Sequence, residues 1–562
     1  MKQKTAYGLF DRIERHPGVF VALLTFILFL PILTVPYFPS EDGPVHLDIV
    51  RLMHDLGTTR FPIGGEYLQT NPYIEPNSTI YLFFLALYHF LLPQTIEKLF
   101  LFIYASLFAA AALYCIDSIN KTNRVVALLF LPLIFNTYLQ LGFFNDALSL
   151  TIFLFAVGYY HRSHANWTIH RSIVMGLLGL LCTLTHITAL VMLLMTIGLL
   201  EIFEAIEGII AGEPHAITGA LLKLSKRAFL MVAIFAPSIV ILASFSFRNG
   251  ISAVSTYQPL RSGLIGLFLS LRHRLIPLAS LIFGNPWLYG PYFLLLAILV
   301  GFSIRHLRAR EVFAPSNRWL VILLIVIVLY FTITLNTHEV EFYERMPPYL
   351  FFFAIMSVSA LSIARYLRHI IVVVVSLTAI FSAVDREARY AHATPEMNEI
   401  MSVADHIRPN ATILVLHFKQ TNISDPYMTG VNPYLHITAR IATLRSGIAM
   451  DSSLLSTSVT GYFPVQYRPD RDPYIYLRVD PTRPEIEAVP PRIDLEDYTA
   501  RTGGSIDYVL IQDFQATEWM HEPTAQDLLR QVSEGYREIY RSKPTGAVIV
   551  YERKDHQDHG SQ

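Results

Sequence analysis

The chain has 562 residues, of which 53% are hydrophobic and only 15% are charged. Soluble domains carry about 25% charged residues, so the composition excludes an ordinary soluble protein and indicates a polytopic membrane protein. A formal net charge of −1 excludes a nucleic-acid partner, which would need a basic face. The only two cysteines, Cys115 and Cys182, lie in apolar runs, which rules out a disulfide scaffold and a thiolate zinc site.

The N-terminal segment is basic, and an apolar stretch follows it. This stretch is about 20 residues long, which is too long for the apolar region of a signal peptide, and no small-residue cleavage site follows it. We therefore expect an uncleaved first span whose N-terminus is cytoplasmic.

Two adjacent carboxylates, Glu41 and Asp42, follow this first span in "PYFPSEDGPVHLDIVRLM". Charge next to hydrocarbon is costly and usually functional. The segment "PVHLDIVRLMHDL" is amphipathic, which predicts a helix along the membrane surface. Asp42 is also placed to be the N-cap of that helix, with Pro44 in its first turn. The two roles are compatible, because a carboxylate at a helix N-terminus stays ionised, as a general base or metal ligand must.

The positive-inside rule decides which apolar runs cross the membrane. If the weak run at 79–92 crosses, three of the five short basic loops fall outside. If it does not cross, all five fall inside. We therefore predict eleven spans, a cytoplasmic N-terminus, an external C-terminus and one long external loop at 38–97. The remaining spans are expected near residues 98–117, 125–141, 147–160, 171–186, 188–208, 228–247, 285–304, 319–336, 347–364 and 369–384.

The same topology brings three later polar clusters to the outer face. Asn145 and Asp146 lie in the turn "GFFNDAL", where they either cap a helix or supply a second carboxylate for a metal or an acceptor. His186 ends a span, as a packing residue or as a phosphate contact. In "NTHEVEFYERMPP", His338 and Arg345 belong either to a solvated loop or to a phosphate site, because arginine binds phosphate in a bidentate manner.

The tail at 385–562 is polar and is predicted to be a small external α/β domain. Its apolar runs "ATILVLHF", "DYVLIQDF" and "AVIVYER" indicate buried strands. The segments "PEMNEIMSVADHIRP" and "AQDLLRQVSEGYREIY" have a helical period. A Pro/Tyr-rich insertion at about 420–500 is expected to be a lid, a docking surface or an irregular cap. The predicted domains are thus 1–384 in the membrane and 385–562 outside it.

This arrangement resembles the GT-C superfamily of integral-membrane glycosyltransferases, which use polyprenyl-phosphate sugars. The resemblance rests on "SEDGPVH" after the first span, "FNDAL" in the place of a second acidic motif, and the external tail ending in "DYVLIQDF", "GYREIYRS" and "GAVIVYERK". It implies a GT-C-like membrane domain and sugar transfer from a polyprenyl-phosphate donor to an external glycan, lipid or protein. A bacterial cell membrane is the expected location. No Walker loop, dinucleotide fingerprint, HExxH motif or nucleophile elbow is present.

The implied roles follow the motifs. Asp42, with Glu41 beside it, is the predicted catalytic base, and Asp146 with Asn145 forms an acceptor or second acidic site. The predicted donor-phosphate ligands are Arg345, His338 and His186. A divalent cation, magnesium or manganese, held by Asp42 and Asp146 is left open, because the first loop has no DxD motif. A transporter or lipid flippase with an external acidic site is the alternative, and it predicts charged residues in the middle of spans rather than at their ends.

Overall fold

The computed structural model describes residues 9–210, 216–249, 263–307, 312–332, 342–419, 427–428, 430–478, 486–514 and 521–554. The chain divides into two compact units. The helical unit comprises residues 1–34, 99–139 and 144–387, and the mixed unit comprises 35–98, 140–143 and 388–562. The first external loop and four residues before Phe144 therefore belong with the tail and not with the membrane helices.

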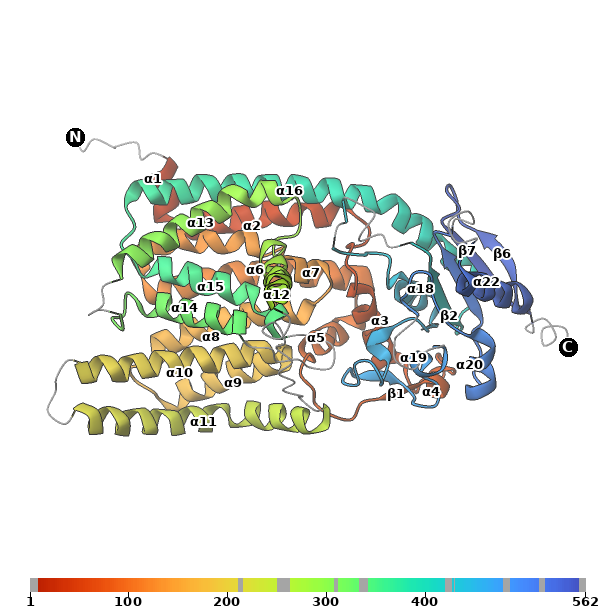
Figure 1. Cartoon of the computed structure of the whole chain (residues 1–562), viewed down its shortest axis with the longest axis horizontal. Coiled ribbons are helices and arrows are strands. Elements are labelled where there is room, and N and C mark those ends of the chain that lie inside the picture. The colour runs from red at the N-terminus through yellow and green to blue at the C-terminus, as the bar shows by residue number, and fades with distance from the viewer. Residues whose placement is uncertain are drawn as a thin grey trace. The chain divides into compact units, whose positions relative to one another are not determined.

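The helical unit consists of α-helices of different lengths, together with 3-10 segments (Figure 1). In its described part they are α1 (Leu9–Arg15), α2 (Pro17–Thr34), α6 (Pro93–Ile119), α7 (Thr137–Gln140), α8 (Phe144–Ser163), α9 (Ile169–Thr185), α10 (Ile187–Ile210), α11 (Ala216–Asn249), α12 (Gly263–Ala279), α13 (Pro286–His306), α14 (Arg318–Thr332), α15 (Pro347–Ser359) and α16 (Arg365–Ser402), with the 3-10 segments η1 (Lys121–Leu133) and η3 (Phe342–Arg345). Helices α6, α7 and α16 each continue into residues of the mixed unit.

Six helices in the described part are long and apolar enough to cross a membrane: Pro17–Thr34, Pro93–Ile119, Ile187–Ile210, Ile217–Arg248, Pro286–His306 and Arg365–His406. The chain is thus an integral membrane protein, and the predicted count of eleven spans stays a prediction. The weak run at 79–92, which is expected not to cross the membrane, contains α5 (Thr79–Tyr88), with 10 residues. Ten residues rise about 15 Å, half of a bilayer's hydrocarbon thickness of about 30 Å.

The segment expected to be a span at 125–141 has a different backbone. It forms the 3-10 segment η1, followed by the short helix α7. Pro132 lies inside η1, and proline cannot donate the hydrogen bond that an α-helix needs. Two buried tyrosines supply donors to backbone carbonyls here: Tyr292 donates to Leu129 at 2.8 Å, and Tyr104 donates to Ile134 at 2.9 Å.

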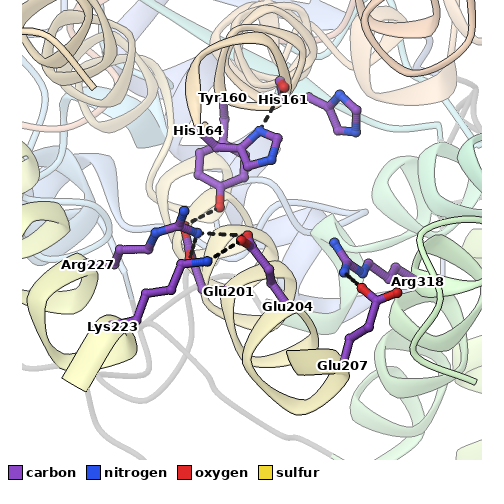
Figure 2. Close-up of polar contacts among 9 residues, drawn as sticks. All are labelled: Tyr160, His161, His164, Glu201, Glu204, Glu207, Lys223, Arg227 and Arg318. Atoms are coloured by element: carbon purple, nitrogen blue, oxygen red, sulfur yellow. Dashed lines mark hydrogen bonds and ion pairs between the residues drawn. The ribbon is translucent and has the colours of Figure 1, made fainter. Parts of the chain in front are cut away.

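A network of ion pairs joins α8, α10, α11 and α14 (Figure 2). Glu201 is buried and accepts the hydroxyl of Tyr160 at 2.6 Å and the guanidinium of Arg227 at 2.6 Å. Arg227 also contacts Glu204 at 2.8 Å, which Lys223 reaches at 2.8 Å. The network holds α11 to α10. The basic segment "KLSKR" at 223–227, one of the five short segments expected to be loops, lies within helix α11.

The mixed unit contains a five-stranded sheet of order β3-β2-β5-β7-β6. Strand β2 pairs in parallel with β3 and β5, and β7 pairs antiparallel with β5 and β6. Strands β2 and β5 are buried at every position, as their continuous apolar sequences predict. The strands are β1 (Leu68–Thr70), β2 (Thr412–His417), β3 (Ile448–Ala449), β4 (Val465–Tyr467), β5 (Tyr508–Gln512), β6 (Tyr536–Arg541) and β7 (Val548–Arg553).

Helices from both parts of the mixed unit's sequence pack together. Helix α3 from the first loop contacts α5 and α18, and β1 from the same loop pairs antiparallel with β4. The helices are α3 (Gly43–Asp55), α4 (Gly64–Tyr67), α5, α18 (Ile437–Arg445), α19 (Pro473–Tyr476), α20 (Leu495–Thr502) and α22 (Pro523–Gly535), with 3-10 segments η4 (Val403–His406) and η5 (Ser453–Leu455).

Two expectations for the tail need correction. The helix predicted over "AQDLLRQVSEGYREIY" ends at Gly535, and the residues from Tyr536 form the edge strand β6. Its charged residues Arg537, Glu538 and Arg541 suit an edge strand, because charges on an edge oppose pairing with other chains. The segment "PEMNEIMSVADHIRP" is helical as predicted, but it continues α16 without a break before η4.

Candidate active site

Glu41 and Asp42 lie in a turn that is held by the backbone of residues 140–143. The amide of Asp42 donates to the carbonyl of Leu141 at 2.9 Å, and that of Glu41 donates to Gln140 at 3.3 Å. Gly142 has φ +89°, and a methyl group there would lie 2.4 Å from the backbone nitrogen of Gly43. The backbone of residues 140–141 therefore holds the turn that carries Glu41 and Asp42, and the close approach of Gly142 to this turn requires glycine.

Asp42 occupies the N-cap position of α3, but its side chain makes no capping hydrogen bond. Its Oδ1 atom lies instead 3.4 Å from Nε2 of His436. His436 is 3% exposed and immediately precedes α18, which packs on α3. The helix cap was one expected role for Asp42, and the contact with His436 points to the other role, in chemistry.

Glu41 is held by a separate contact. The backbone amide of Asn432 donates to its Oε2 atom at 2.7 Å. Burial raises the pKa of Glu41 to about 7; the Asn432 hydrogen bond opposes this rise, and the negative charge of Glu487 adds to it. A carboxyl group with a pKa near 7 can exchange a proton at neutral pH. Two adjacent carboxyl groups thus have different environments, the usual arrangement for acid and base roles.

Three polar side chains of α3, those of His46, Asp48 and Arg51, are buried. His46 shares a 2.7 Å hydrogen bond with the hydroxyl of Tyr81. Asp48 and Arg51 form a 2.8 Å ion pair, and each is 1% exposed. Helix α18 packs against α3. The polar residues in the amphipathic pattern of α3 therefore make contacts inside the protein.

Three more of the predicted site residues meet in the helical unit. Asp146, in the first turn of α8, forms an ion pair with Nη1 of Arg345 at 2.8 Å, and its other oxygen lies 3.2 Å from Nδ1 of His186. The side chains of Asp146, His186 and Arg345 are 13%, 19% and 10% exposed. Asp146 lies at the start of α8, His186 lies at the junction of α9 and α10, and Arg345 is the last residue of η3. Three helix ends therefore meet at the carboxylate of Asp146.

The proton on His186 decides how it contacts Asp146. The backbone amide of Thr188 also approaches Nδ1 of His186, at 3.3 Å. A lone pair on Nδ1 would accept from Thr188, whereas a proton on Nδ1 would be donated to the carboxylate. The Thr188 amide donates a hydrogen bond to Nδ1, which places a lone pair there in the neutral ring, and the Asp146 contact is an ion pair when the ring is protonated.

A small pocket opens beside this cluster. Its lining includes both polar side chains and an aromatic wall, and the Arg345 guanidinium lies over the ring of Tyr138, 5.6 Å from its centre. The lining residues are Asn136, Tyr138, Asp146, Ala147, Leu150, Arg345, Pro348 and Tyr349. A guanidinium at a pocket wall that is ion-paired to a carboxylate is suited to bind an anionic ligand.

The remaining predicted residues are placed as follows. Asn145 is buried in the first turn of α8. His338 lies outside the described residues. In the described part of the chain, no group of three or more histidine, cysteine, aspartate or glutamate side chains is arranged to hold a metal ion. The divalent cation proposed for Asp42 and Asp146 stays a prediction.

Sequence reasoning missed His436, Asn432 and Glu487. All three lie in the Pro/Tyr-rich segment, far along the chain from the carboxylates that they influence. The available signal was the group of polar residues in "VNPYLHITAR", directly before a helix. This segment has the composition of a turn, so the sequence alone does not distinguish it from an ordinary loop.

No protein-family model matches the chain, and no curated protein matches its sequence. Solved structures do match. The oligosaccharyltransferase of Archaeoglobus fulgidus, in complex with zinc and sulfate, is 10% identical with a TM-score of 0.45, over 95% of this chain and 73% of that chain. ArnT from Cupriavidus metallidurans, bound to undecaprenyl phosphate, is 11% identical with a TM-score of 0.35, over 95% and 97%. At these identities and TM-scores no residue role is taken from either protein.

Proposed function

We propose that the chain is a membrane glycosyltransferase that moves a sugar from a polyprenyl-phosphate donor to an external acceptor. The observation that carries this proposal is the cluster of Arg345, Asp146 and His186 at a pocket where ends of membrane helices meet. Ionisable groups at such a position are costly and usually functional. A guanidinium beside a histidine is suited to a phosphate that is attached to a lipid chain.

In the proposed reaction the acceptor hydroxyl oxygen attacks the anomeric carbon, and the bond from that carbon to the phosphate oxygen breaks. The electron pair of the broken bond goes to the polyprenyl phosphate, and the hydroxyl proton goes to Asp42. Attack opposite the leaving group inverts the anomeric centre. Arg345 and His186 stabilise the charge of the leaving phosphate, and Asp146 orients both of them while the phosphate is absent.

Glu41 has a supporting role in this scheme. With a pKa of about 7, it is partly protonated at neutral pH and can donate a hydrogen bond where a second full charge would repel Asp42. This division of roles explains how two neighbouring carboxyl groups can share one turn.

The test is sugar transfer from a panel of radiolabelled polyprenyl-phosphate sugars in membranes that contain the full chain. Wild-type protein should transfer at least one sugar, and D42N should not, while both bind the donor. R345M should weaken donor binding, and R345K should weaken it less. The control is R162M, because Arg162 makes an ion pair with Asp117 away from these clusters. No transfer from any donor by folded wild-type protein would favour the transporter alternative.

A further inference from the structure

His436 and Asp42 face one another from the starts of two packed helices. His436 immediately precedes α18, and Asp42 immediately precedes α3. A carboxylate at an N-cap normally accepts an amide hydrogen of its own helix, but Asp42 does not, and it lies 3.4 Å from Nε2 of His436 instead. Something other than helix capping therefore fixes the direction of this carboxylate.

The contacts of the imidazole identify its tautomer. A carboxylate can only accept, so a hydrogen bond to Asp42 needs the proton on Nε2. The other ring nitrogen, Nδ1, is buried without a hydrogen-bond partner among the described residues, which suits a neutral ring with its lone pair on Nδ1. Burial also lowers the pKa of His436, against the opposing effect of Glu487. The ring is thus a neutral donor.

Other titratable groups surround the pair. Glu487 interacts with both Glu41 and His436. Two further histidines, His46 and His417, interact with His436, and burial lowers the pKa of each, to about 3 and about 4. Tyr81 interacts with Asp42. His46 and His417 are therefore neutral at physiological pH and bring no positive charge to the Asp42 carboxylate. The contact with His436 thus affects the orientation of this carboxylate more than His46 and His417 do.

We propose that His436 is the positioning residue of Asp42: its Nε2–H holds the carboxylate in the direction from which it takes the acceptor's proton. The catalytic role of Asp42 rests on the proposed function, whereas the 3.4 Å contact between Nε2 of His436 and Oδ1 of Asp42 does not. A neutral donor fixes the direction of the carboxylate and leaves its negative charge uncompensated. A lysine or arginine at the same place would compensate that charge.

Two variants that replace His436 by a side-chain amide test whether a donor at the position of Nε2 is needed, or whether any polar side chain is enough. In His436→Gln the side-chain nitrogen can reach the place of Nε2, whereas in His436→Asn it reaches only the place of Nδ1. H436Q should therefore keep the bond to Asp42, and H436N should lose it. H417N is the matched control, because His417 is a neighbouring buried histidine that contacts the carbonyl of Leu435 and not Asp42.

The first readout needs no sugar. Dicyclohexylcarbodiimide labels protonated carboxyl groups in apolar surroundings, and mass spectrometry of the full chain in detergent, labelled between pH 5 and 9, gives a labelling midpoint for Asp42. Loss of a hydrogen bond to the charged form raises a carboxyl pKa. The midpoint should therefore rise by about one pH unit in H436N, and it should stay at the wild-type value in H436Q and H417N. An unchanged midpoint in folded H436N, or an equal rise in H436Q, would overturn the proposal.

The second readout is transfer itself. H436N should lower kcat at least tenfold with KM unchanged, and H436Q should restore most of the loss. If wild-type protein transfers no sugar, the proposed function fails, but the labelling midpoints still decide whether His436 holds Asp42. If H436N is not recovered in folded form, His436→Met, which has no donor, takes its place in the labelling experiment with the same expected rise.

Discussion

Gly142 offers a direct test of the turn that holds the acid pair. Its φ of +89° lies in the left-handed region, and a methyl group there would meet the backbone of Gly43 and Asp42 at 2.4–2.9 Å. Gly57 has nearly the same φ, +85°, but a methyl group there would have no neighbour within 4 Å. The two glycines therefore differ in the contact and share the conformational strain.

The expected cost follows from these two terms. Alanine in the left-handed region costs about 1–2 kcal/mol, and this applies to both G142A and G57A. Overpacking costs about 1–3 kcal/mol more, and this applies to G142A alone. The unfolding midpoint of G142A should thus lie below that of G57A by roughly 2–12 °C, at about 2–4 °C per kcal/mol for a unit of this size.

The assay compares thermal unfolding and sugar transfer for both variants in the same detergent. G142A should also lose transfer, because the methyl group displaces the backbone of Asp42, whereas folded G57A should keep wild-type transfer. Equal midpoints and equal transfer for the two variants would refute the argument that residues 140–143 hold the acid pair in place.

Three further predictions concern charged groups. Glu41 binds a proton more tightly in the folded state, since its pKa rises from 4.5 to about 7. Its contribution to stability is therefore lost as pH rises between these two values. A denaturation series across that pH range should show wild-type stability falling relative to that of E41Q. The Glu399 carboxylate accepts from the hydroxyl of Ser542 and the amides of residues 545–547, so E399Q should destabilise the mixed unit by about 1.5–3 kcal/mol, and a loss below 0.5 kcal/mol would contradict this. R227M leaves Glu201 buried without its cation, which should cost about 3–5 kcal/mol, while R227K should cost less; equal unfolding midpoints for the two variants would argue against the network in Figure 2.

Much of the mixed unit's sheet could be predicted because its local signals agree. Strands β2, β5 and β7 are short apolar runs that end at polar turns, and each is a strand in the structure. Strand β6 was missed because "YREIYR" has helix-forming charged residues, and its edge pairing to β7 overrides that preference. Strand pairing is a tertiary effect that a window of sequence does not contain.

The candidate site was predictable only in part, for a similar reason. Asp146, His186 and Arg345 were each recognisable, because a polar residue at the end of an apolar run is conspicuous. Their assembly around a single carboxylate depends on how helices pack, which periodicity does not specify. His436 lacked such a signal, since it lies in a polar segment where one more histidine is unremarked, and only the packing of α18 on α3 brings it to Asp42.

The discontinuous sequence of the mixed unit has a consequence for its biogenesis. Glu97 and Arg440 form a buried ion pair, and 343 positions separate them. At about 5–20 residues per second, the ribosome needs roughly 20–70 s to make the second partner after the first. During that interval β1 has no β4 to pair with, and the polar face of α3 has no α18 to cover it. The early loop must therefore remain without these partners until synthesis is almost complete, and a factor that shields exposed loops during translation would act on this segment first.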